Sequence, residues 1–167
     1  MLLNLLRLNL KSPYKVWPGH RPNEYMFMTD YGGVYYISFM ENQLIWADHT
    51  YEFGIIPTGK RVNSPNDAKL KQTVIAVIED FFHENPNVLL YQCETGDSKQ
   101  AMRARLFQRW FDGYQHKDKY LIKVAMIMDE NVENYDAILI RRDNPHFNEI
   151  IEQFDAFVHE MGDKPQI

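Results

Sequence analysis

The residues "VLLYQCETGDSKQAMRARLFQRWF", at positions 88–111, carry the strongest fold signal in the chain. It opens on the largely apolar run "VLLYQC", which predicts a central strand buried on both faces of a sheet. Turn-forming residues follow, and large apolar residues then recur at helical spacing, which predicts a helix over 98–114. A buried strand leading at once into an amphipathic helix is typical of a domain whose helices cover a sheet.

The residues before this stretch predict a hairpin, a third strand and a helix. The aromatic runs "YMFMT" and "VYYISFME" flank the turn "DYGG", which indicates a β-hairpin. "YEFGIIP" predicts a third strand ended by Pro57. Ser64 as N-cap and Pro65 at the first helical position begin a helix, and the Asn85–Pro86 pair ends it.

The residues after it predict two more strands and a last helix. "YLIKVAMIMD" and "YDAILIRR" are joined by the turn "ENVEN". Asn144 caps the last helix, Pro145 starts it and Gly162 ends it. The order is β-β-β-α-β-α-β-β-α, so we expect an α+β domain with a single mixed or antiparallel sheet of about six strands and three helices. This domain is expected to span residues 25–162.

Residues 1–24 form a leucine-rich arm and a proline-rich linker. The arm, "MLLNLLRLNLKSP", is too short to span a bilayer and has no basic region before its leucines. We expect a short helix or strand docked on the domain or on a neighbouring subunit. A stripe of exposed leucines needs a cover, which favours a homodimer or a protein partner over a membrane. The stripe consists of Leu2, Leu3, Leu6 and Leu10.

Composition and charge exclude several classes of function. The formal net charge of −5 argues against a general nucleic-acid-binding role. Cys93 is the single cysteine, so no internal disulfide can form and a cytoplasmic protein is expected. The six histidines lack the close paired spacing of metal ligands, so no metal site is predicted. Cys93 itself is interpreted as a buried structural thiol.

Two basic residues at the start of the 98–114 helix raise a functional question. Lys99 and Arg103 fall on the side of the helix that the apolar residues occupy, where an unpaired cation is costly. In one interpretation Asp97 and Gln100 form a capping box, and Glu94, Asp97 or a more distant carboxylate neutralises Arg103. In the other, the strand-to-helix corner binds an anion. The residues of this candidate anion site are Lys99, Arg103, Gly96, Asp97 and Gln100.

The sequence resembles an uncharacterised bacterial family of unknown function. The segments that carry the resemblance are "FFHENPNVLLYQCETGDSKQAMRARLFQRWF", "MTDYGGVYYISF" and "ILIRRDNPHFNEII". The resemblance covers about residues 25–160. It implies no activity, because the family has none assigned.

The order of elements is also similar to the fold of acetyl-coenzyme-A-dependent N-acetyltransferases. The segment "PTGKRVNSPND" departs from the glycine-spaced pyrophosphate loop of that fold, and Phe107 stands where a general-acid tyrosine is expected. No functional residue carries over. Because no set of nucleophile, base and orienting group is visible, the sequence favours a binding or interaction module. The alternative is an acyltransferase-like enzyme, or a binder of coenzyme A or a nucleotide, that uses the corner at 94–103. The sequence identifies no cofactor.

Overall fold

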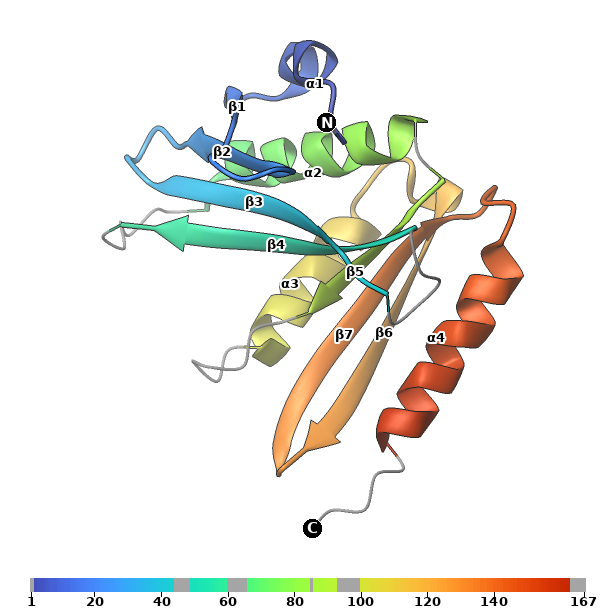
Figure 1. Ribbon diagram of the computed structural model, residues 1–167. Coiled ribbons are helices and arrows are strands. Elements are labelled where there is room, and N and C mark those ends of the chain that lie inside the picture. The colour runs from blue at the N-terminus through green and yellow to red at the C-terminus, as the bar shows by residue number, and fades with distance from the viewer. Residues whose placement is uncertain (1, 44–48, 60–65, 85, 93–99, 163–167) are drawn as a thin grey trace. The chain divides into compact units, whose positions relative to one another are not determined.

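The computed structural model describes residues 2–43, 49–59, 66–84, 86–92 and 100–162 (Figure 1). Within these ranges it contains four α-helices and seven strands, which form one mixed sheet in the order β1-β2-β3-β4-β5-β7-β6. The strands are β1 (Val16–Pro18), β2 (Glu24–Met28), β3 (Val34–Glu41), β4 (Thr50–Thr58), β5 (Val88–Gln92), β6 (Tyr120–Asp129) and β7 (Val132–Arg141). The helices are α1 (Leu5–Lys11), α2 (Ala68–Glu84), α3 (Gln100–Asp112) and α4 (Phe147–Gly162). The predicted α+β class is confirmed, and α1 and β1 are additional to the predicted order.

The chain divides into two compact units. The first consists of Met1–Met40 and Phe53–Asn85, and the second of Glu41–Glu52 and Pro86–Ile167. Each unit has buried apolar residues from both its strands and its helices. They are described separately below.

In the first unit, β1, β2 and β3 form an antiparallel sheet, which confirms the predicted hairpin. Alternate residues of these strands and of β4 are buried, as expected for a sheet with one covered face. Helix α2 supplies the cover, and its Phe81 stacks on Phe39 with ring centroids 5.0 Å apart and planes 1° from parallel. The buried strand residues of this unit are Val16, Tyr25, Phe27, Ile37, Phe39 and Phe53.

Helix α2 begins later than predicted. Its first residue is Ala68, and the Asp67 carboxylate accepts hydrogen bonds from the backbone N–H groups of Lys69 (3.0 Å) and Leu70 (3.2 Å). Ser64 and Pro65 lie outside the described residues. Serine and aspartate are equally good N-caps, so the sequence pattern does not distinguish the two starting points.

Strands extend into two segments in which the sequence placed prolines as breaks. The proline-rich linker predicted within residues 1–24 contains strand β1, in which Val16 pairs with Phe27 and Trp17 with Met26. Strand β4 continues past Pro57 to Thr58 instead of ending there. Pro18 is tolerated because β1 is an edge strand, where a missing N–H costs no ladder hydrogen bond, and Pro57 is the next-to-last residue of β4.

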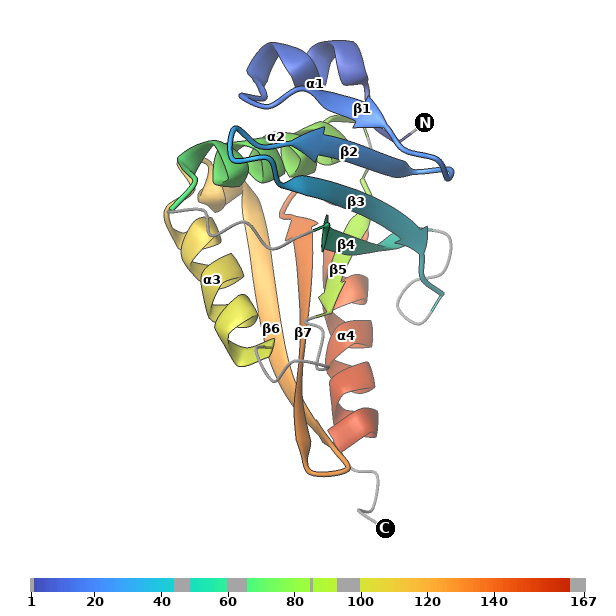
Figure 2. The same cartoon turned by 90° about the vertical axis from the view of Figure 1, so that its left-hand side faces the viewer.

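In the second unit, β5, β7 and β6 form an antiparallel sheet with α3 on one face and α4 on the other (Figures 1 and 2). On the α3 side, Tyr91 stacks on Phe107 at 4.7 Å. Strand β5 is therefore buried on both faces near its start, as predicted. The core on the α4 side consists of Val88, Leu90, Ile138, Ile140, Ile150 and Phe154.

The connections of the second unit are tighter than the sequence suggested. The turn between β6 and β7 contains two residues, Glu130 and Asn131, instead of all of "ENVEN". Both have positive φ angles, 47° and 65°, as a two-residue hairpin turn of the I′ type requires. Asn144 caps the turn before α4 by accepting from the His146 N–H at 2.9 Å, and the helix itself begins two residues after Pro145, at Phe147.

Candidate functional site

The corner predicted to bind an anion lies almost entirely outside the described residues. This holds for Cys93 and for Glu94, Gly96, Asp97 and Lys99. Gln100 and Arg103 belong to helix α3, but their side chains are also outside the described part of the chain. The pairing of Arg103, the capping box and the anion site therefore stay predictions, and no described geometry favours the acyltransferase-like alternative.

The described side chains of α3 revise its predicted buried face. Phe107 stacks on Tyr91, but Met102 and Leu106, which the helical spacing groups with the other apolar residues of this helix, are exposed. The side of α3 that contacts the sheet is therefore narrower than the spacing of its apolar residues suggests. Part of the apolar surface of α3 is therefore exposed to solvent.

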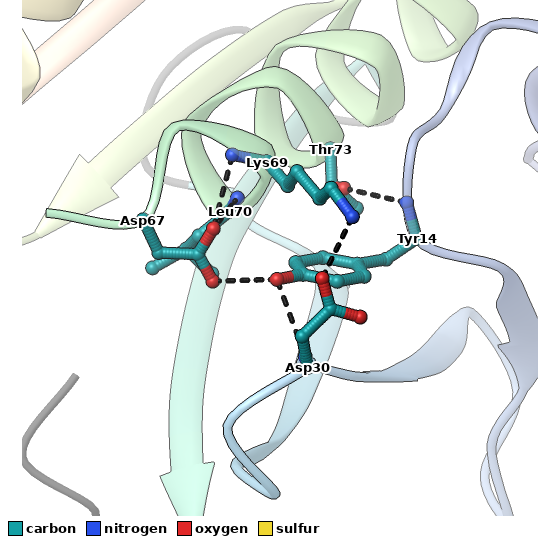
Figure 3. A network of polar contacts seen from close by, with 6 residues as sticks. All are labelled: Tyr14, Asp30, Asp67, Lys69, Leu70 and Thr73. Atoms are coloured by element: carbon teal, nitrogen blue, oxygen red, sulfur yellow. Dashed lines mark hydrogen bonds and ion pairs between the residues drawn. The ribbon is translucent and has the colours of Figure 1, made fainter. Parts of the chain in front are cut away.

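The clearest described polar arrangement is centred on Tyr14, between the arm and α2 in the first unit (Figure 3). The Tyr14 hydroxyl donates to the Asp67 carboxylate at 2.8 Å and accepts from the Asp30 N–H at 3.2 Å. The Tyr14 N–H donates to the Thr73 hydroxyl at 3.3 Å. The Lys69 ammonium pairs with the Asp30 carboxylate at 2.7 Å and lies 5.7 Å from the Tyr14 ring centroid.

The properties of this network indicate a stabilising role. Burial raises the pKa of Tyr14 above the usual tyrosine value; the hydrogen bond from the Asp30 N–H opposes this effect, and the bond to Asp67 adds to it. The phenol therefore stays protonated and does not serve as a base near neutral pH. Because its hydroxyl donates to one group and accepts from another, the network ties the arm, the β2–β3 turn and the start of α2 together.

A second polar contact fixes helix α1 on α2. The Asp80 carboxylate accepts from the Arg7 side chain (Nε, 2.6 Å) and from the Asn4 N–H (2.7 Å). The Asp80 side chain is only 3% exposed, and that of Arg7 is 24% exposed. The Leu3 N–H donates to the Tyr25 hydroxyl at 3.3 Å. A helix of seven residues is too short to be stable alone, so these contacts hold it in place.

The docking of α1 sorts the leucines of the arm into two groups. Leu3 and Leu8 are buried, whereas Leu6 and Leu10 are 86% and 87% exposed. The predicted stripe of Leu2, Leu3, Leu6 and Leu10 is therefore not exposed as a whole. Leu6 and Leu10 are one helical turn apart and so lie on the same side of α1. We call these two residues the α1 leucine pair.

A small cavity lies between α1 and α2. Its volume is about 20 Å³, room for little more than a water molecule and far below the range of pockets that enclose a drug-sized ligand. Much of its charge is already engaged by the Arg7–Asp80 pair. It therefore does not define a ligand site. The lining residues are Arg7, Leu8, Lys11, Ala76, Glu79, Asp80 and His83.

The second unit contains a buried carboxyl group, Asp136, in the middle of β7. Burial raises the pKa of Asp136 above the usual range, a hydrogen bond from Gln92 lowers it, and the charge of Glu52 raises it further. Raised carboxyl pKa values occur at many active sites. Here the neighbours form neither a described cavity nor a metal site, because no described group of three or more acidic, histidine or cysteine side chains is placed to hold an ion.

The sequence pattern points to only some of the residues in these polar contacts. Asp80 stands out as an acid between Val77 and Phe81, which the helical pattern buries, but nothing in the pattern identified Arg7 as its partner. Tyr14 and Asp136 carried no comparable signal. In the part of the chain that the structure describes, no helix combines the length and apolar character that a bilayer crossing requires.

The fold and the described contacts define an α+β domain whose polar clusters stabilise its structure. The chain belongs to the family of unknown function DUF6169, whose model matches residues 66–156, more than half of the chain. This confirms the resemblance to an uncharacterised family, although the matched span begins after the β2–β3 hairpin. Comparison with curated proteins and with solved structures gave no match. Nothing in these comparisons supports the similarity to acetyltransferases.

Proposed function

We propose that this domain is an interaction module that binds another protein through the α1 leucine pair. One observation carries the proposal: Leu6 and Leu10 are the two most exposed large apolar side chains of the described residues. Exposed leucines confer no folding stability in the free chain, because their apolar surface stays in water. Two of them on one side of an anchored helix are typical of a helix that inserts into an apolar groove.

The anchoring of α1 supports this role. The Arg7–Asp80 pair, the Asn4–Asp80 hydrogen bond and the burial of Leu3 and Leu8 hold the helix on α2 before any partner binds. The Asn9 side chain adds two hydrogen bonds to the backbone of Val16, at 2.8 and 2.9 Å. A pre-organised docking helix loses little conformational freedom on binding, which favours affinity.

The charge of the arm indicates the chemistry of the partner. Residues 1–15 contain Arg7, Lys11 and Lys15 and no acidic residue, in a chain whose formal net charge is −5. Arg7 is committed to Asp80, so Lys11 and Lys15 are the cations that flank the α1 leucine pair in sequence. We infer a protein partner with an apolar groove and an acidic rim. We place this interaction in the cytoplasm, in keeping with the single cysteine.

The test combines crosslinking with a matched surface variant. A photoreactive amino acid at position 10 is expected to crosslink one defined protein in cells, whereas the same group at exposed Ile56 of β4 is not. The purified partner should then bind the wild type and the Ile56→Asp control, and lose binding to the Leu6→Asp/Leu10→Asp variant. Equal binding by all three proteins contradicts the proposal. Cosedimentation of the wild type with anionic vesicles, in the absence of any partner protein, also contradicts the proposal, because it identifies a membrane surface as the binding target.

A further inference from the structure

Strand β6 is an unusually open sheet edge. It is the terminal strand of the sheet order and contains ten residues, without proline or glycine. The strand at the other end, β1, has three residues and ends on Pro18. Natural proteins usually protect an edge by keeping it short, or by placing proline, charge or a bulge on it. β1 has such protection, and β6 has neither a short length nor a proline.

The hairpin geometry shows which backbone groups of β6 face outwards. The two-residue turn places Asp129 opposite Val132 in register, and such flanking residues form a hydrogen-bonded pair. Pairs alternate along an antiparallel ladder, so Ile127, Ala125 and Lys123 bond to β7. The even-numbered residues in between direct their N–H and C=O groups away from β7. Along the described chain, no strand pairs with that side of β6.

The same even-numbered residues present an apolar stripe. Val124, Met126 and Met128 are 40%, 50% and 39% exposed, and strand alternation places them on the α3 face of the sheet. Figures 1 and 2 both show the β6–β7 hairpin extending beyond the lower end of α3, so the helix leaves this part of the face uncovered. Lys123, the residue type that commonly guards an edge, is instead paired with Asp155 of α4.

We propose that β6 pairs with β6 of a second copy of this chain, antiparallel, with Met126 opposite Met126 across a two-fold axis. This register lets outward N–H and C=O groups of both copies bond to each other. It sets Val124 opposite Met128 twice, so the two apolar stripes join into one. It also puts Lys123 at the register position across from residue 129 of the other copy, an aspartate in the sequence. Shifting the axis to residue 125 would instead put Lys123 across from Ile127.

This register favours a second copy over an unrelated peptide strand: the apolar stripe meets itself, and Lys123, which pairs with Asp155 in its own chain, stands across from an acidic position instead of an apolar one. A two-fold interface uses the same surface from both partners, and the β6 sequence is complementary to itself in one register. The proposal is independent of the α1 leucine pair, because α1 and β6 belong to different units. Each can therefore fail without affecting the other.

The experiment measures the mass of the full chain in solution under reducing conditions, by sedimentation or light scattering. The wild type is expected to be a dimer. Met126→Lys and Met126→Glu are each expected to be monomeric, because each places two like charges face to face at the axis. An equimolar mixture of the two variants should recover the dimer, since a lysine then faces a glutamate. Met28→Lys, at a 57% exposed methionine of β2, serves as the matched control and should remain dimeric.

Several results would overturn the proposal. They are a monomeric wild type, a Met126→Lys variant that stays dimeric, and a mixture of the two charged variants that stays monomeric. A dimer that is lost in the Leu6→Asp/Leu10→Asp variant, but not in the Met126 variants, would assign self-association to α1 and contradict pairing through β6. Circular dichroism of each variant checks that the fold is retained, as expected for a half-exposed position.

Discussion

Replacing Asp80 with alanine removes the contact that anchors α1, and the structure sets the size of the effect. The carboxylate accepts from the Arg7 side chain at 2.6 Å and from the Asn4 N–H at 2.7 Å while almost fully buried. Breaking a fully buried ion pair costs about 3–5 kcal/mol. Arg7 is 24% exposed and can turn to solvent after the substitution, so we expect the lower end, about 3 kcal/mol. For a chain of this length, that corresponds to a fall of roughly 6–12 °C in Tm.

Urea unfolding measures this loss, and hydrogen exchange locates it. In Asp80→Ala the amides of α1 should lose more protection than those of α4, in the other unit. The control is Asp30→Ala, which removes an ion pair of similar length (2.7 Å) whose side chains are 54% and 61% exposed. Water screens that pair, so its loss should fall within experimental error. Equal effects of the two substitutions, or unchanged exchange in α1, would show that Asp80 does not anchor this helix.

Three further outcomes are expected. Tyr14→Phe keeps the ring but removes the hydroxyl that donates to Asp67. It should lower the free energy of unfolding, measured in urea, by about 1–2 kcal/mol. An unchanged urea midpoint would contradict a stabilising role of the Tyr14 network. Asp136→Asn should stabilise the chain at neutral pH, because the raised pKa means that folding favours the uncharged carboxyl. The difference in stability between Asp136→Asn and the wild type should shrink as pH falls into the usual carboxyl range. Urea midpoints measured across pH test this, and a difference that grows as pH falls would contradict a raised pKa of Asp136. Coenzyme A, acetyl-coenzyme A and nucleotides should leave Tm unchanged; a rise that Arg103→Met abolishes would instead support the anionic-ligand alternative.

Local patterns in the sequence predicted most of the elements correctly. The β2–β3 hairpin follows from aromatic strands around a glycine turn, and β5 follows from its apolar run. Helix α4 follows from the spacing of Ile150, Phe154 and their apolar neighbours. These predictions succeed because the period of the apolar residues directly reflects which face is buried.

Other features depend on contacts between residues far apart in the chain. Strand β1 exists because Val16 and Trp17 pair with β2, although the local sequence is rich in proline. Leu3 is buried and Leu6 exposed because of where α1 docks, which the run of leucines does not reveal. The exposed leucines behind the proposed function were expected as a stripe, but the pair itself was identified only from the fold.

Local sequence patterns suffice for the α+β class, the family and the order of elements from the first hairpin onwards, because these depend on short-range periodicity and on residue types at turns. The tertiary structure alone decided which buried charge meets which partner, as with Asp80 and Arg7. It also decided which strand ends the sheet and so leaves β6 open to pairing. Partners and sheet edges depend on distances in space between residues far apart in the chain, and local periodicity does not encode those distances.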